Sequence, residues 1–153
     1  MATACIGIGS NLGDRAAQCR EAIIRLRQAD CCILNVSTFI ETEPWELSDQ
    51  PYFLNGALTI ATNMPPEALL SLLKAIEKAM GRQETVRFGP RVIDLDILLY
   101  DDLVLQSKTL TIPHPHLHER LFALQSLAEI APEALHPLFK KTVLELLKEA
   151  DRA

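Results

Sequence analysis

The chain has 153 residues, of which 48% are hydrophobic and 23% charged; this balance is typical of one soluble globular domain with a proper core, so we expect a single domain over residues 1–153. A net charge of -5 argues against binding of nucleic acid through bulk charge. No apolar run reaches the roughly 18 residues that cross a membrane and no basic signal-peptide start is present, so we expect no membrane contact and a cytoplasmic location.

The first half of the chain predicts three strands and one helix. An apolar run over residues 4–9 predicts the first strand, and Asp14 can cap the helix that follows. Residues 31–41 predict one long strand, and residues 52–61 predict another. The polar, proline-bounded stretch between them predicts a loop, which contains Trp45, the chain's one tryptophan.

The second half predicts a helix, a basic loop and an acidic strand. Pro65 and Pro66 open the helix, and Gly81 is a natural end for it. Residues 82–91 predict a loop that carries three arginines, and the strand with the acidic residues follows it.

The last third predicts shorter elements. Residues 100–102 form a predicted turn into a short strand at residues 103–105. Apolar spacing predicts a helix over residues 119–130, and a capping box made by Thr142 and Glu145 opens a final one.

Asp94 and Asp96 lie two residues apart in an otherwise apolar run. Residues i and i+2 of a strand point to the same face, so both carboxylates project together while Leu95 and Ile97 point into a core. Two acids on one face of a buried strand repel each other and lose hydration, and a divalent metal is the readiest way to offset that cost. This strand therefore predicts a metal site.

Basic side chains surround the acidic strand in sequence. Arg82 and Arg91 lie in the loop before it, and arginines that converge on a metal-bearing strand favour phosphate, although a plain surface loop would also be charged. Three histidines fall within residues 114–118, but two prolines hold this stretch extended, so the imidazoles should diverge. We expect one histidine to face phosphate and expect no structural zinc site.

Phe53 and Asn55 share one face of the strand predicted over residues 52–61. A planar heterocycle would suit this pair, because its ring could stack on the phenyl group while the amide reads its polar edges. Plain core packing of Phe53 is the open alternative.

The order strand-helix-strand-strand-helix-strand is typical of an α+β fold, a ferredoxin-like β-α-β-β-α-β sheet. We expect helices on one face of this sheet, with a β-hairpin and C-terminal helices appended. The other face is expected to be open, which is where a ligand site would be built.

Taken together, these motifs resemble the 6-hydroxymethyl-7,8-dihydropterin pyrophosphokinase family over nearly the whole chain. The most specific of them is Gly-Pro-Arg followed by Asp-Leu-Asp. The resemblance rests on Gly9-Ser10-Asn11-Leu12-Gly13, Glu41-Thr42-Glu43-Pro44, Phe53-Leu54-Asn55, Ile76-Glu77, Gly81-Arg82, the run from Phe88 to Leu98, Ile112-Pro113-His114-Pro115 and Arg120-Leu121-Phe122.

The resemblance implies transfer of pyrophosphate from ATP to the hydroxymethyl group of the pterin, with release of AMP, in folate biosynthesis. It implies that Asp94 and Asp96 hold two Mg²⁺ ions and that Arg82 and Arg91 engage the phosphates, all four acting as catalytic residues.

The resemblance also implies the substrate sites. Phe53 and Phe122 would enclose the pterin ring and Asn55 would read its edge. The remaining pterin contacts implied are Thr42, Glu43, Trp45 and Phe88. The implied ATP contacts are Glu77, Ile97, Leu110, Thr111 and His114.

The chain departs from the family pattern at the nucleotide. Thr109 stands where the family often carries an arginine, and Lys74 stands where a glutamine is common. The loop after Arg82 is a residue shorter than in some members. These departures concern nucleotide affinity and leave the paired acids and the pterin residues intact.

Two other classes of function remain open on the residues alone. One is another magnesium-dependent phosphotransferase or phosphodiesterase, which would not need Phe53, Asn55 and Phe122 together. The other is a non-catalytic domain, which has no reason to keep paired acids beside three arginines. The expected partners are the two small-molecule substrates, and the expected assembly is a monomer.

Overall fold

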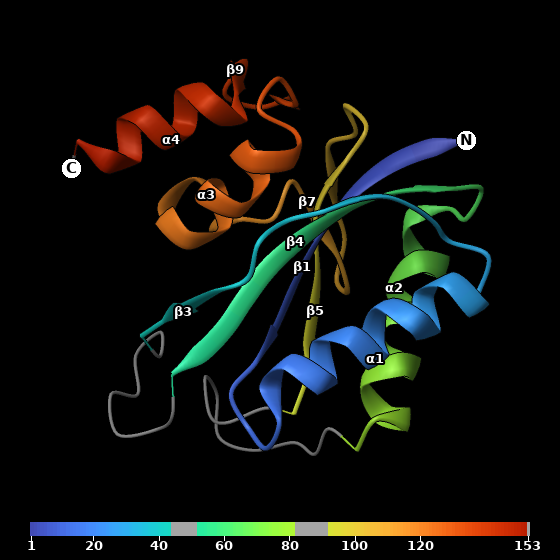
Figure 1. The fold of residues 1–153 in the computed structure, drawn as a ribbon. Coiled ribbons are helices and arrows are strands. Elements are labelled where there is room, and N and C mark those ends of the chain that lie inside the picture. The colour runs from blue at the N-terminus through green and yellow to red at the C-terminus, as the bar shows by residue number, and fades with distance from the viewer. Residues whose placement is uncertain (44–51, 82–91, 153) are drawn as a thin grey trace.

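A computed structural model of the protein describes residues 1–43, 52–81 and 92–152 (Figure 1). No helix within these ranges is both long and apolar enough to cross a membrane. The elements are β1 Ala2–Ser10, α1 Arg15–Gln28, β2 Cys32–Val36, β3 Ile40–Thr42, β4 Phe53–Thr62, α2 Pro66–Ala79, β5 Asp94–Tyr100, β6 Leu105–Gln106, β7 Thr111–Ile112, the 3-10 helix η1 Leu117–Glu119, α3 Leu121–Ile130, β8 Leu135–His136, β9 Lys141–Thr142 and α4 Val143–Asp151.

The main sheet has the strand order β2-β4-β1-β5, with β3 also paired to β4, and every pair is antiparallel. Helix α1 connects β1 to β2, and α2 connects β4 to β5. The chain is therefore a mixed protein of helices and antiparallel sheets. Strand β1 lies between β4 and β5 in the middle of the sheet. It therefore sets the spacing between the side chains of these two strands.

The single long strand predicted over residues 31–41 is wrong. The chain forms β2 and β3 instead, and both pair with β4. Ser37 interrupts them because its side-chain oxygen accepts a hydrogen bond of 2.8 Å from the N–H of Ala57, while its own N–H donates to the Ala57 carbonyl at 2.9 Å.

The predicted helix starts are confirmed at two positions. The Asp14 side chain accepts a hydrogen bond of 3.1 Å from the N–H of Ala17. Thr142 and Glu145 form the predicted capping box, with bonds of 3.0 and 3.1 Å in the two directions. Each of these contacts is local, so the residue pattern alone is enough to place it.

Two hydrophobic cores lie on opposite faces of the sheet (Figure 1). Helices α1 and α2 cover one face, where Ile6 and Ile8 of β1 are buried. We expected the other face to be open, and this expectation is wrong in part. Helices α3 and α4 cover part of it, because the apolar side of α3 buries Leu124 and Leu127 there. A ligand site on this second face is therefore confined to the part of the sheet that α3 leaves uncovered.

The segment after β5 differs in detail from the prediction. The short strand was predicted at residues 103–105, but the strand observed there is β6, Leu105–Gln106, and it pairs with β7. Asp101, in the predicted turn, has a φ of 46° and its carboxylate accepts a hydrogen bond of 2.8 Å from the N–H of Thr3. This acid therefore closes the turn and ties it to β1.

Candidate active site

Asp94 and Asp96 lie half-buried on the same side of β5, as the alternation predicts. Leu95 and Ile97, which point the other way, are buried in the core shared with α1 and α2. The paired carboxylates thus occupy the second face of the sheet and are held at a fixed spacing by a strand whose other face is fully packed.

Two glycines of β1 lie opposite these acids in the sheet, Gly9 beside Asp94 and Gly7 beside Asp96. A Cβ atom on Gly9 would lie 2.3 Å from Oδ1 of Asn55, a distance that real contacts do not allow. Glycine at this position therefore makes room for the Asn55 amide. Sequence reasoning missed this role, and its signal was two glycines at i and i+2 within a strand.

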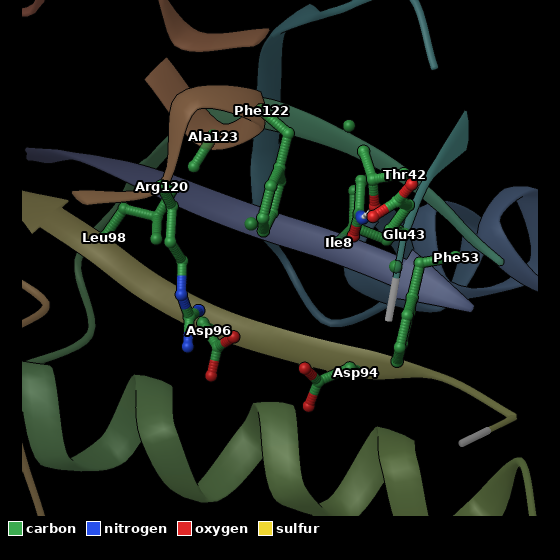
Figure 2. Close-up of a pocket in the computed structure, with 14 residues that line it drawn as sticks. Ile8, Thr42, Glu43, Phe53, Asp94, Asp96, Leu98, Arg120, Phe122 and Ala123 are labelled. Carbon is green, nitrogen blue, oxygen red and sulfur yellow. Dashed lines mark hydrogen bonds between the residues drawn. The ribbon is translucent and has the colours of Figure 1, made fainter. Parts of the chain in front are cut away.

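A first pocket on this face gathers residues that are far apart in the sequence (Figure 2). Phe53 from β4 and Phe122 from α3 stand on two sides of it, and Asp94 and Asp96 lie below them in the view. The sequence-predicted residues that line it are Thr42, Glu43, Phe53, Asn55, Asp94, Asp96 and Phe122. All the described residues predicted for the pterin are therefore brought together beside the paired acids.

One hydrogen bond inside the first pocket joins two of these residues. The Asn55 side-chain N–H donates to the hydroxyl oxygen of Thr42. This bond crosses from β4 to β3, so the Asn55 amide is held in one orientation by the neighbouring strand.

A second pocket lies along the other side of the same acids. It includes Lys74 and Lys108, which are its lysines among the described residues. The sequence-predicted residues that line it are Glu77, Asp94, Asp96, Ile97, Leu110, Thr111 and His114. Because Asp94 and Asp96 line both pockets, two ligands bound in them would meet at the two carboxylates.

Glu77 is buried on α2, with 5% of its surface exposed. Its Oε2 accepts a hydrogen bond of 2.8 Å from the N–H of Leu95. This contact ties α2 to β5 between the two aspartates, so Glu77 shapes the second pocket and also positions the acidic strand.

His114 lines the second pocket, and its ring is oriented by the chain around it. The backbone N–H of His114 donates to the Leu98 carbonyl at 3.0 Å. The ring Nδ1 of His114 accepts a hydrogen bond of 3.1 Å from the backbone N–H of His116. Burial, together with the nearby charges of Arg120 and His116, lowers the pKa of His114 to about 4. The ring is therefore neutral near pH 7 with its proton on Nε2, where it can donate to a phosphate oxygen.

Arg120 is a site residue that sequence reasoning missed. It precedes α3, lines the first pocket, and its guanidinium end lies toward Asp96 (Figure 2). A cation here offsets the repulsion between the two carboxylates. The sequence signal was the motif Arg120-Leu121-Phe122, which was used for the resemblance without giving Arg120 a role.

Four predicted site residues lie outside the described ranges. These are Trp45, Arg82, Phe88 and Arg91. Within the described ranges no group of three or more histidine, cysteine, aspartate or glutamate side chains could hold a metal ion.

A family model and similar known proteins point to the same family. A family model described as 7,8-dihydro-6-hydroxymethylpterin-pyrophosphokinase (HPPK) matches residues 5–132. The 2-amino-4-hydroxy-6-hydroxymethyldihydropteridine pyrophosphokinase of Aquifex aeolicus is 42% identical over 149 residues, which cover 97% of this chain and 92% of that protein. The Bacillus subtilis protein of the same name is 44% identical over 131 residues, which cover 85% of this chain and 78% of its own length.

The fold is also shared with a longer solved protein. A crystal structure of Plasmodium falciparum HPPK-DHPS with pteroate matches with a TM-score of 0.77 at 18% identity. The match covers 97% of this chain but 42% of that one, so this chain spans less than half of the longer protein.

Proposed function

Because the chain belongs to the 7,8-dihydro-6-hydroxymethylpterin-pyrophosphokinase family, we propose that it transfers pyrophosphate from ATP to the hydroxymethyl group of 6-hydroxymethyl-7,8-dihydropterin, a step of folate biosynthesis. The observation that carries the proposal is the position of Asp94 and Asp96, which line two adjoining pockets at once. An enzyme that joins two substrates needs such a boundary, because the reacting atoms must come within about 3.5 Å of each other.

We assign the pterin to the first pocket. Phe53 and Phe122 would enclose the flat ring from two sides, and the Asn55 amide would bind its polar edge. The bond from Asn55 to Thr42 supports this assignment, since it orients the amide before any ligand arrives. Glu43 completes the described wall, and we propose that Trp45 and Phe88 add to it.

We assign ATP to the second pocket. His114 would donate from Nε2 to the triphosphate, and Lys74 and Lys108 would supply positive charge. The remaining proposed contacts are Glu77, Ile97, Leu110 and Thr111. Arg82 and Arg91 are proposed to stabilise the charge that builds on the transferring phosphates.

The chemistry of the paired acids fits magnesium. Asp94 and Asp96 offer carboxylate oxygens from one face of a rigid strand, and magnesium commonly takes one or two protein carboxylates and completes its shell with water and substrate phosphate. We propose that these two residues hold two Mg²⁺ ions. When bound, magnesium would neutralise phosphate charge and favour loss of the proton from the attacking hydroxyl.

The reaction forms one bond and breaks another. The pterin hydroxyl oxygen bonds to the β-phosphorus of ATP, the bond from that phosphorus to the oxygen it shares with the α-phosphorus breaks, and AMP leaves while the hydroxyl gives up its proton. The chain's own part is to align the two substrates and to keep the carboxylates in place: β5 fixes their spacing, and Glu77 anchors β5.

The finer structural assignments belong with this proposal. The strand order, with helices after β1 and β4, supports a ferredoxin-like β-α-β-β-α-β topology. We propose that residues 1–153 act as one domain and as a monomer in the cytoplasm, with the two small molecules as partners.

The product of the nucleotide tests the proposed function. The protein is incubated with ATP, magnesium and 6-hydroxymethyl-7,8-dihydropterin, and nucleotides are separated by chromatography. AMP should form in step with pyrophosphorylated pterin, and no AMP should form when the pterin is omitted. ADP as the product would contradict pyrophosphoryl transfer.

A further inference from the structure

Arg15 joins three elements at the edge of the first pocket. It is the first residue of α1, directly after the capping residue Asp14. Its Nη1 donates to the carbonyl of Tyr52 at 2.9 Å, and its Nη2 donates to the carboxylate of Glu41. One guanidinium thus connects the start of α1 to β3 and to the residue before β4.

These contacts fall at the end of the ladder between β3 and β4. The last pair in that ladder is Thr42 with Phe53, and both residues line the first pocket. Strand β3 is three residues long and lies against β4 alone among the described strands, so its backbone bonds are few. Short ladders of this kind open locally at low cost.

The residues before Arg15 fix its backbone position at the start of α1. The preceding Gly13 has a φ of +69° and Asp14 caps the helix, so the first turn of α1 is set relative to β1. The Arg15 side chain is 28% exposed and that of Glu41 is 59% exposed. A partly covered arginine that bridges two segments with its planar fork constrains both of them.

We propose that Arg15 is a positioning residue for the pterin pocket. By linking Glu41 to the Tyr52 carbonyl, it keeps the Thr42–Phe53 pair closed and so holds two walls of the pocket at the spacing the flat ring needs. The inference rests on the proposed placement of the pterin in the first pocket. Arg15 does not line either pocket itself, so it acts through Thr42 and Phe53.

Steady-state kinetics of the Arg15→Ala protein test the inference. The KM for the pterin should rise roughly twofold to fivefold, the range set by one partly exposed charged contact. The KM for ATP and kcat should stay within about twofold, because the second pocket and the carboxylates are untouched. Arg15→Lys should restore part of the pterin KM, since an ammonium can pair with Glu41 but lacks the fork that reaches both partners.

Arg25→Ala is the matched control. Arg25 lies on the same helix, forms an exposed ion pair of 3.2 Å with Glu21 four residues away, and lines neither of the two pockets. All three kinetic constants should stay at the wild-type values. A double mutant that combines Arg15→Ala with Glu41→Ala adds a second check. The effects of these two changes on the pterin KM should be less than additive, because both changes break the same contact.

Distinct outcomes separate this inference from the proposed function. An unchanged pterin KM in Arg15→Ala, or equal rises in both KM values with a lower Tm, would overturn the positioning role. Asn55→Ala tests the pocket itself: if it raises the pterin KM while Arg15→Ala does not, only the inference on Arg15 fails. If Asn55→Ala also leaves the pterin KM unchanged, the placement of the pterin fails, and the inference fails with it.

Discussion

The Oε2 of Glu77 accepts a hydrogen bond of 2.8 Å from the N–H of Leu95, the residue between Asp94 and Asp96. Strand β5 is therefore fixed from the side of α2 at the point where it carries both carboxylates. The bond is buried, so neither partner can turn to water if the other is removed.

Glu77→Ala should destabilise the protein by about 1–3 kcal/mol, because it leaves the Leu95 N–H buried without its acceptor. Glu77→Gln keeps an acceptor oxygen at the same reach and should lose less. Urea unfolding of the two variants measures the difference. Equal stabilities of the two variants would show that this bond does not hold β5.

Asp96→Ala should lower kcat by at least about a hundredfold, because it removes half of the carboxylate pair at the boundary of the two pockets. The fold should survive, since the change also removes repulsion from Asp94. Steady-state assays together with circular dichroism measure both effects. Asp102→Ala, in the exposed turn after β5, removes an equal charge away from the pockets and should keep near-normal activity; near-normal activity of Asp96→Ala would refute the assignment.

Local patterns explain what the sequence could predict. The common face of Asp94 and Asp96 follows from alternation along one strand, and the caps at Asp14 and Thr142 involve residues three positions away. Each depends on neighbours in the chain, so the residue pattern contains the information.

Contacts between segments that are distant in the chain explain what the sequence could not predict. β2 ends before Ser37 because Ser37 hydrogen-bonds to Ala57, twenty residues later in the chain. No feature of the sequence near Ser37 indicates that partner. Arg120 reaches the first pocket because α3 packs over the second face of the sheet, which depends on where its apolar residues find a core. The missing information in both cases was tertiary.

His114 makes stability depend on pH in a defined window. Its folded pKa of about 4 lies below the ordinary value of 6.5, so between these values the unfolded chain binds a proton that the folded protein does not. The contribution of His114 is thus complete above pH 6.5 and falls as the pH drops toward 4. Because a difference of one pKa unit corresponds to about 1.4 kcal/mol, the shift from 6.5 to about 4 predicts a loss on the order of 3 kcal/mol.

A His114→Asn variant isolates this effect, because its side-chain oxygen can still accept from the His116 N–H. The free energy of unfolding of the wild-type protein should decline more steeply than that of the variant between pH 6.5 and 4. His136, whose pKa burial also lowers, is present in both proteins and cancels in the comparison. Parallel curves would contradict the buried, neutral state of His114.

Gly9→Ala should raise the KM for the pterin at least about fivefold, a change of about 1 kcal/mol. The new Cβ would lie 2.3 Å from Oδ1 of Asn55, so the amide must leave the orientation that its bond to Thr42 gives it. Gly7→Ala is the matched comparison, because its Cβ would meet Leu98 at 3.4 Å, an ordinary contact. Both glycines line the same pocket on the same strand, so a smaller rise for Gly7→Ala separates displacement of Asn55 from loss of a glycine in β1. Equal effects of the two changes would mean that the Asn55 amide does not set pterin affinity.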